Sequence, residues 1–412
     1  MRTTARLISV VVLAVAAIIV VHVQPRDLPR ATPESVGMSA EKLQSVTALL
    51  RQFVTDRKIS GAVAAVARRG KIVYLEPVGL QSFETRAPMT DRSLFRVYSM
   101  TKAVTAVGVM MLVDEGKLRL ADPVSKYLPE FRAVKVRDGG TGAPRDPSRA
   151  ITIQDLLLHT SGLSHRTSDL YRQLNVRSRA QALPQFVTNI TRAPLLEDPG
   201  TRFRYSEATT VLGRVIEIVA AKPFDAFVND RILIPLGMTD TTWWVEGDAA
   251  TRLATVYQRD KSGTVAPFEI EEVPFTEKPA LIEGAVGLVS TAADFIRFGQ
   301  MLLNKGTFNG VRLLKEATAE SMTKNGLTDP MVQARGGAMG WGLGNVDVVV
   351  GPGSRGYLTT IGEYGWDGSA GTFFAVDPSR ELVVTLMTQN LPANPDGLRQ
   401  KFKAAIVESI VQ

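Results

Sequence analysis

The chain contains no cysteine and only three histidines in 412 residues. The absence of cysteine excludes a thiol nucleophile, a cysteine-ligated metal site and disulfide bonds, and it is compatible with an exported protein. The three histidines, at positions 22, 159 and 165, are too few and too scattered for an all-histidine metal site. We therefore expect neither a metal ion nor another cofactor.

The sequence also lacks a long run of lysine or arginine, although its formal net charge is +7. Because the positive charge is spread and no nucleic-acid-binding motif is present, we expect no nucleic-acid partner. The absence of a Gly-x-Ser-x-Gly pentapeptide excludes the nucleophile turn of the α/β-hydrolases. His159 is expected to cap carbonyls at a helix end and His165 lies in a polar loop, so a histidine-based catalytic triad has little support.

Residues 1–25 predict a signal peptide or an N-terminal membrane anchor. Two arginines in the first six residues precede an apolar stretch over residues 7–23, as in export signals. Cleavage after Ala16 would leave apolar residues on the mature chain, so we favour an uncleaved anchor, although the stretch is slightly shorter than the roughly 20 residues of a membrane helix. We expect a protein outside the cytoplasm, periplasmic or membrane-anchored, with residues 26–38 as a linker.

The pattern of apolar residues predicts an α+β fold. An amphipathic helix begins at Ser39, and two β-like runs over 62–67 and 71–75 are joined by Arg68-Arg69-Gly70, a hairpin signal. Further elements are expected nearer the C-terminus: helices over 291–303 and 397–411, strands over 372–376 and 381–387, and a glycine-rich bend over 335–344.

The middle of the chain is helical and rich in loops. A capping box at Thr152-Ile153-Gln154-Asp155 begins a short helix, and helical periodicity returns over 211–219. We therefore divide the chain into an α/β sheet domain (39–130 and 281–412) and a helical insert domain (131–280). The sheet domain is built from both chain ends, with helices flanking the sheet.

Ser99 and Lys102 are the first candidates for catalysis. They stand three residues apart, so they project from the same side of the first turn once a helix forms. Residues 103–113 are almost entirely apolar, which indicates a buried helix. Burial would favour the neutral form of the Lys102 amine, which could then accept the Ser99 proton.

The Ser-x-x-Lys pattern occurs three times, and context separates the copies. Ser39 is expected to be the N-cap of an amphipathic helix, with Lys42 in solvent. Ser321-Met322-Thr323-Lys324 repeats the Ser99 tetrapeptide but precedes Asn325-Gly326, a turn signal, so it is expected at a helix end. Only Ser99 follows an extended run and precedes a buried helix, so the chemistry is assigned to Ser99.

Tyr205 is the third candidate, in a turn and extended run immediately before a helix. A phenol close to cationic groups can lose or relay a proton more readily than a free tyrosine.

Taken together, the motifs resemble the serine β-lactamase and penicillin-binding-protein superfamily, and most closely the family VIII carboxylesterases related to class C β-lactamases. The resemblance spans residues 32–410 and depends on an ordered set of segments. These segments are Ser99-x-x-Lys102, Leu156 to Leu163 (LLLHTSGL), Tyr205, Pro235 to Met238 (PLGM), Gly287 to Ala292 (GLVSTA) and Gly365 to Thr372 (GWDGSAGT).

This resemblance implies roles for individual residues. Ser99 would be the nucleophile, with Lys102 and Tyr205 sharing the role of base. The oxyanion would lie between the backbone N–H groups of Ser99 and Ser369. The substrate-binding residues would be Tyr98, Trp366, Asp367 and Gly368.

Two departures from class C β-lactamases favour a neutral substrate. Tyr205-Ser206-Glu207 stands in place of Tyr-x-Asn, and Trp366-Asp367-Gly368 stands in place of Lys-Thr-Gly. The missing lysine removes a cation that helps to hold the substrate carboxylate in those enzymes, and an indole offers an apolar surface instead. Asp367, if it faces the cleft, would repel an acidic substrate.

The sequence therefore predicts a serine hydrolase that cleaves small-molecule carboxylic esters, with short acyl chains, through an acyl-enzyme on Ser99. One alternative is a β-lactamase or D-alanyl-D-alanine carboxypeptidase that uses another cation, such as Arg335, for the carboxylate. A second alternative is a non-catalytic sensor module that resembles penicillin-recognition domains. Membrane attachment would run through residues 7–23.

Overall fold

The computed structural model describes residues 27–140, 142–353 and 356–411. The expected signal or anchor over residues 1–25 lies outside the described residues. Within the described ranges, no helix has both the length and the apolar character needed to cross a membrane.

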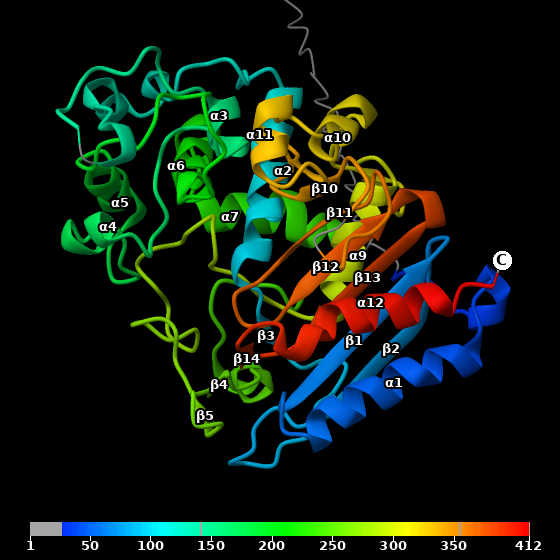
Figure 1. The fold of residues 1–412 in the computed structure, drawn as a ribbon. Helices are drawn as coiled ribbons and strands as arrows, with labels where there is room; N and C mark the ends of the chain where they lie inside the picture. Colours follow the sequence, from blue (N-terminus) through cyan, green and yellow to red (C-terminus); the bar gives the residue numbers. More distant parts are fainter. Residues whose placement is uncertain (1–26, 141, 354–355, 412) are drawn as a thin grey trace, which may run out of the picture.

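A seven-stranded sheet forms the centre of the molecule (Figure 1), in the order β2-β1-β13-β12-β11-β10-β9. Every neighbouring pair is antiparallel. The strands are β1 (Gly61–Arg68), β2 (Lys71–Gly79), β9 (Met339–Trp341), β10 (Asp347–Val349), β11 (Tyr364–Asp367), β12 (Phe373–Asp377) and β13 (Leu382–Met387). The pairing of β1 with β13 joins the two chain ends in one sheet, which confirms the predicted α+β sheet built from both ends of the chain.

The β1–β2 hairpin forms where the sequence predicts it. Arg69 and Gly70 both have positive φ, at 50° and 71°. Two consecutive left-handed residues match the right-handed twist of the flanking strands, and glycine adopts this conformation without strain.

Helices cover both faces of the sheet. The helices α1 (Ala40–Thr55) and α12 (Leu398–Glu408) pack together on one face, and α9 (Ala292–Leu303) packs against β1, β12 and β13 on the other. Ser39 and Thr291 cap α1 and α9 by accepting hydrogen bonds from the N3 backbone N–H groups. Each helix buries one apolar stripe, so the sheet has a core on each side.

The insert packs around α2 (Thr101–Asp114) beside the sheet (Figure 1). Its helices are α3 (Ile153–Leu157), α4 (Asp169–Gln173), α5 (Leu183–Ile190), α6 (Ala208–Ala220), α7 (Phe224–Val228) and α8 (Ile234–Leu236). Gly108 allows a close approach, because a Cβ atom there would lie 3.2 Å from side-chain atoms of Ile216 and Phe227. The expected buried helix after Ser99 is therefore confirmed, with twelve of its fourteen residues buried.

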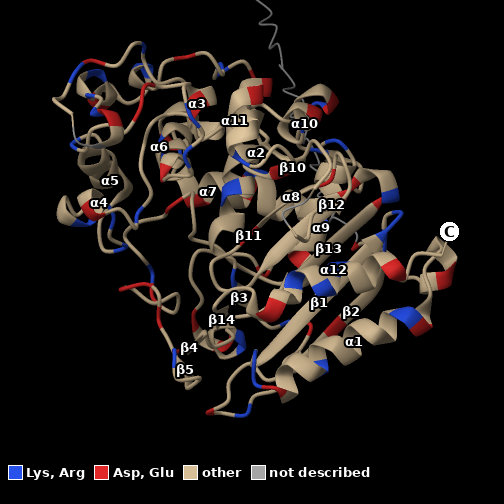
Figure 2. Cartoon of the chain, in the orientation of Figure 1, with Lys and Arg blue, Asp and Glu red and all other residues tan. Residues whose placement is uncertain are grey.

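Short strands and helices complete the described chain. These are β3 (Phe95–Arg96), β4 (Tyr257–Arg259), β5 (Val265–Pro267), β6 (Val289–Ser290), β7 (Thr307–Phe308), β8 (Val311–Arg312), β14 (Asn390–Leu391), α10 (Glu316–Met322) and α11 (Asp329–Ala334). Figure 2 shows acidic and basic residues interspersed over the elements, which agrees with the spread charge of the sequence.

Three expectations about organisation need correction. Residues 257–267, expected in the helical insert, include β4 and β5, and β4 pairs with β14 from the sheet domain. Residues 26–38 are not a free linker where they are described, because Val36 and Met38 are buried against the sheet domain. The expected bend over 335–344 contains strand β9, and Gly340 is needed there because a Cβ would lie 2.4 Å from Asn325 Oδ1.

Candidate active site

Ser99 lies where an extended segment turns into α2. Strand β3 pairs with β6, and a short 3-10 helix over Tyr98–Met100 leads into α2. The Val97 N–H donates to Leu288 O at 3.0 Å, and the Leu288 N–H donates to Thr101 Oγ1 at 3.1 Å. These bonds hold Ser99 at the N-terminal end of a buried helix, as the sequence predicts.

The Lys102 amine contacts the Ser99 hydroxyl. Its Nζ atom lies 3.3 Å from Ser99 Oγ and donates to Ala285 O at 2.9 Å. The residue is 1% exposed. Burial lowers the pKa of the Lys102 amine to about 7, against an opposing attraction from Glu207. A substantial fraction of Lys102 is therefore neutral at neutral pH and able to accept a proton.

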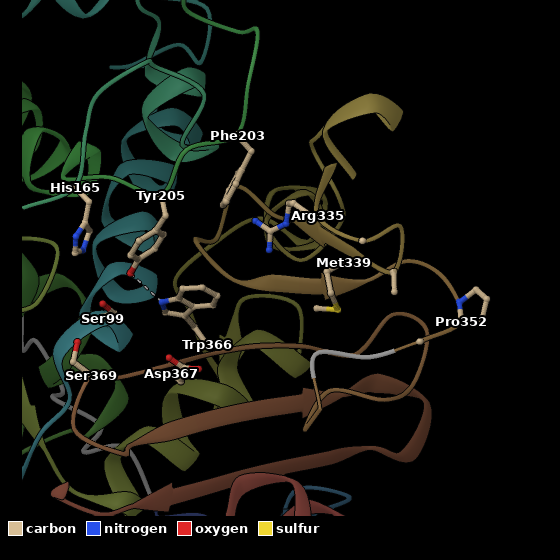
Figure 3. A pocket seen from close by; sticks show the side chains of 13 residues that line it. Ser99, His165, Phe203, Tyr205, Arg335, Met339, Pro352, Trp366, Asp367 and Ser369 are labelled. Carbon is tan, nitrogen blue, oxygen red and sulfur yellow. Dashed lines mark hydrogen bonds between the residues drawn. The ribbon is translucent and has the colours of Figure 1, made fainter. Parts of the chain in front are cut away.

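Tyr205 approaches Ser99 from the loop before α6. Its hydroxyl accepts a hydrogen bond from Trp366 Nε1 at 3.2 Å and points towards Ser99 (Figure 3), whose side chain acts to lower the pKa of the phenol. Burial raises the pKa of the Tyr205 phenol well above its usual value. The expectation that cationic neighbours would ease proton loss from this phenol is wrong, because desolvation of the phenolate and the negative charges of Asp367 and Glu207 raise its pKa. Tyr205 is protonated at neutral pH.

A buried ionic cluster lies next to Lys102. Arg166 Nε donates to Glu207 Oε1 at 2.9 Å, and Arg177 forms ion pairs with both Glu271 and Glu283. Burial would raise the pKa of the Glu207 carboxyl, but the Arg166, Lys102 and Arg177 cations outweigh it and hold that pKa at about 2. Sequence reasoning noted Glu207 only as a departure from Tyr-x-Asn and missed the arginines, which lie far from Lys102 along the chain.

Ser99 lines a cavity of about 710 Å³, and the walls of this cavity near Ser99 are largely aromatic. Its lining consists of Ser99, His165, Phe203, Tyr205, Arg335, Gly336, Ala338, Met339, Pro352, Gly353, Trp366, Asp367 and Ser369. The Trp366 and Trp341 rings are perpendicular with centroids 4.6 Å apart, and Trp366 also packs on Tyr205 at 5.3 Å. Figure 3 shows Ser99 and Ser369 at one end, with Met339 and Pro352 at the other.

The two charged residues in this lining are ion-paired. Arg335 pairs with the buried Asp347 and stacks its guanidinium 4.0 Å from the Phe203 ring centroid. Asp367 accepts a hydrogen bond from Arg399 at 2.8 Å and another from Tyr357 at 3.1 Å. Asp367 therefore lies at the cavity, as the sequence suggested, but its negative charge is balanced there.

Residues 46–408 match the family model described as Beta-lactamase. The chain belongs to the Beta-lactamase family. It is similar to Protein Rv1367c of Mycobacterium tuberculosis (strain ATCC 25618 / H37Rv), at 35% identity over 362 residues that cover 84% of this chain and 89% of that protein. It is also similar to Esterase EstB of Burkholderia gladioli, at 30% identity over 381 residues that cover 86% and 93%.

Among solved structures, EstCE1, described as a hydrolase with promiscuous acyltransferase activity, shares the fold with a TM-score of 0.79. The two sequences are 26% identical, and the match covers 89% of this chain and 98% of EstCE1. The predicted place in the serine β-lactamase and penicillin-binding-protein superfamily, near the family VIII carboxylesterases, is confirmed. This Beta-lactamase family member is a serine hydrolase.

Two of the residues expected to bind substrate in this Beta-lactamase family member are absent from the cavity lining. The Tyr98 side chain is 1% exposed and packs edge-on against Phe275, with ring centroids 5.8 Å apart. Gly368 instead allows two backbone segments to approach closely, because a Cβ atom there would lie 2.6 Å from Val97 O. Trp366, Asp367 and Ser369 do line the cavity.

The two described histidines flank the Tyr205 ring. His159 does not cap carbonyls as expected: it is fully buried, and its Nδ1 accepts the Ser206 N–H at 3.2 Å. Burial holds the pKa of His159 well below its usual value, so the ring is neutral. His165 stacks on Tyr205 with centroids 5.8 Å apart and lines the cavity. Within the described ranges, neither imidazole hydrogen-bonds to Ser99.

No three histidine or acidic side chains gather in the described part of the chain in a way that could hold a metal ion. The absence of a metal and of other cofactors stays a prediction.

Proposed function

We propose that this protein is a serine carboxylesterase that acts on neutral small-molecule esters through an acyl-enzyme on Ser99. The observation that carries the proposal is the Lys102 amine, with its pKa of about 7, placed 3.3 Å from the Ser99 hydroxyl beside an aromatic cavity. The similarity to Esterase EstB supports an ester substrate.

In the acylation step, neutral Lys102 takes the Ser99 proton while Ser99 Oγ forms a bond to the ester carbonyl carbon. The carbonyl electrons move onto oxygen, and the backbone N–H groups of Ser99 and Ser369 stabilise this oxyanion. Donors of this kind contribute roughly 3 kcal/mol each. Within the described residues, the Ser369 N–H donates no other hydrogen bond, which supports this role.

Collapse of the intermediate breaks the bond to the alcohol oxygen. Tyr205, protonated because of its burial, donates its proton to this leaving oxygen, and the Lys102 ammonium returns a proton to the phenolate. Water then attacks the acyl-enzyme while neutral Lys102, acting through Tyr205, accepts its proton. Ser99 regains a proton when the acid leaves, so no proton is gained or lost by the enzyme over the cycle.

The cavity supports a neutral ester with a short acyl chain and a bulkier alcohol. Tyr205 and Trp366 lie beside Ser99, and the cavity extends from there towards Met339 and Pro352. A volume of about 710 Å³ lies within the usual range for drug-sized ligands. We assign the part beside Tyr205 and Trp366 to the acyl group and the part towards Met339 and Pro352 to the alcohol.

The β-lactamase and D-alanyl-D-alanine carboxypeptidase alternative needs a cation for the substrate carboxylate. Arg335 is the cation in the cavity lining, and its ion pair with Asp347 favours a structural role for it. We therefore rank this activity below ester hydrolysis. The non-catalytic sensor is ranked lower still, because Lys102 lies 3.3 Å from Ser99 Oγ and 4.7 Å from the Tyr205 ring centroid, so all three candidate residues gather at one site.

The test compares a nitrophenyl ester of a short acid with nitrocefin on the same purified protein, and measures Ser99 labelling by a fluorophosphonate. We expect ester turnover at least a hundredfold above nitrocefin turnover, together with stoichiometric labelling of Ser99. Preferred nitrocefin cleavage would replace the proposal with a β-lactamase. A folded protein that neither labels nor turns over would indicate the sensor.

We also propose that the enzyme works outside the cytoplasm and is attached to the membrane through residues 7–23. Fractionation of cells that express the full chain should place it in the membrane fraction, accessible to protease added on the outer side. Recovery in the cytoplasmic fraction would contradict this proposal.

A further inference from the structure

The turn between β11 and β12 carries the proposed oxyanion donor, and its backbone is tightly defined. The Gly368 N–H donates to Thr372 O at 2.8 Å, and the Gly371 N–H donates to Gly368 O at 3.2 Å. Gly371 has a φ of 104°, which residues other than glycine rarely adopt. Ser369 lies inside this turn, so the direction of its N–H depends on the shape of the whole turn.

Arg399, from the first turn of α12, binds both ends of this turn. One guanidinium nitrogen (Nη2) donates to Gly368 O at 3.0 Å and to Thr372 O at 3.3 Å. The other (Nη1) donates to the Asp367 carboxylate at 2.8 Å. Arg399 is 6% exposed, so water competes little for these bonds. A planar guanidinium can bridge three acceptors in fixed directions, whereas an ammonium cannot.

The backbone of Arg399 is held as well. Its N–H donates to Asn394 Oδ1 at 2.9 Å, and α12 packs along α1 on the face of the sheet. Asp367 receives a second bond from Tyr357. The bridge from α12 to the turn is therefore anchored on both sides. It joins Arg399 to Gly368, 31 residues away along the chain and next to Ser369.

We propose that Arg399 is a positioning residue for the oxyanion hole, which acts by holding the 367–372 turn so that the Ser369 N–H faces the developing oxyanion. The inference rests on the proposed function. Oxyanion donors contribute to catalysis only when they are aimed at the charge that develops in the transition state, and a shift of about 1 Å can reduce the rate by about a hundredfold. Arg399 does not line the substrate cavity, so its loss should leave ground-state binding largely intact.

The test compares Arg399→Gln and Arg399→Lys with Lys403→Met. Lys403 is the matched control, because it lies one turn further along α12 and forms a buried ion pair with Glu363 outside the 367–372 turn. We expect Arg399→Gln to lower kcat by about ten- to a hundredfold with KM changed less than about threefold. Arg399→Lys should be intermediate, and Lys403→Met should retain kcat.

Two further readouts separate positioning from a loss of stability. Affinity for a trifluoromethyl ketone, whose adduct with Ser99 carries an oxyanion, should fall in parallel with kcat/KM in the Arg399 variants. Thermal unfolding of all three variants identifies any that do not fold. If Arg399→Gln does not fold, the kinetic comparison is made with Arg399→Lys. Unchanged kcat and ketone affinity in a folded Arg399 variant would overturn the inference, and so would an equal loss in Lys403→Met.

The rate of Ser99 labelling by a fluorophosphonate keeps this test separate from the proposed function, because the phosphonyl oxygen uses the same oxyanion hole whatever the natural substrate is. If the unaltered protein labels but cleaves no ester, the proposed function fails, and slower labelling of the Arg399 variants still supports the inference. If the unaltered protein neither labels nor cleaves, both fail.

Discussion

The Lys102 amine lies 4.7 Å from the centroid of the Tyr205 ring and 3.3 Å from Ser99 Oγ. Burial favours the neutral form of both groups, so it shifts their pKa values in opposite directions. It lowers the pKa of Lys102 to about 7, which makes a base available, and raises the pKa of Tyr205, which keeps an acid available. Desolvation is therefore the main cause that makes both proton-transfer partners available, and within the described residues no imidazole hydrogen-bonds to Ser99.

This arrangement predicts that kcat/KM rises with pH through about 7. Lys102 must be neutral to accept the Ser99 proton, and it is neutral above its pKa, so activity should fall about tenfold per pH unit well below 7. The measurement is kcat/KM on a neutral nitrophenyl ester between pH 5 and 9, with the stability of the protein checked at each pH.

His165 is the control for this profile. It lines the cavity, and burial lowers its pKa from the usual range for histidine, so it also titrates in the acidic region. The profile of a His165→Gln variant should retain the ionisation near 7. Loss of that ionisation in the variant would assign it to the imidazole and not to Lys102.

Ser99→Ala should remain folded and lose at least about a thousandfold in kcat, together with all fluorophosphonate labelling. The matched control is Ser321→Ala, because Ser321 begins an identical Ser-Met-Thr-Lys tetrapeptide at the end of α10 and is not part of the cavity lining. That variant should retain full activity. Activity retained in Ser99→Ala, or lost in Ser321→Ala, would show that the nucleophile has been misassigned.

Lys102→Met should abolish activity and stabilise the fold. The unfolded amine titrates near 10.5 and the folded one near 7, so between these values the unfolded state binds more protons and stability rises with pH. Below about pH 7 the folded protein bears the full penalty, on the order of a few kcal/mol. Urea unfolding at pH 6, 7 and 9 should show the largest gain for the variant at pH 6. No gain at pH 6 would contradict this penalty for burying the Lys102 charge.

Trp366→Phe should lower kcat by about fivefold. Phenylalanine keeps an aromatic wall but removes the Nε1–H that donates to the Tyr205 hydroxyl, and a single hydrogen bond contributes about 1 kcal/mol. The smaller ring also leaves Tyr205 less well oriented towards the leaving group. Kinetics with a series of esters of increasing alcohol size provides the measurement, and an unchanged kcat across the series would show that this hydrogen bond has no catalytic part.

Several predicted features were confirmed because they depend on neighbours along the chain. The hairpin turn at Arg69 and Gly70, the caps at Ser39 and Thr291 and the apolar helix after Ser99 all follow from the preferences of a few adjacent residues. The same holds for the i, i+3 spacing that brings Lys102 to Ser99. Context also placed the other two Ser-x-x-Lys copies correctly, since Ser39 is an N-cap and α10 ends at Met322.

Other features were wrong or missed because they depend on packing between distant segments. Tyr98 follows the extended run as expected, yet its side chain turns into the core against Phe275. The Ser206 N–H donates a hydrogen bond to His159, 47 residues away, and no pattern of neighbouring residues predicts that contact. The arginines around Glu207 and the bridge from Arg399 to the 367–372 turn are long-range contacts of the same kind.

The sequence by itself determined the fold class and the closeness of Ser99 and Lys102, through apolar periodicity and short-range spacing, and it indicated the family through the ordered set of motifs that it resembles. Only the tertiary structure decided the burial that lowers the pKa of Lys102 and raises that of Tyr205, the ion pair that neutralises Asp367, and the contacts of Arg399 with the 367–372 turn. The physical reason is that pKa values and charge balance depend on how much water remains around a group, and that is set by segments that meet only after folding.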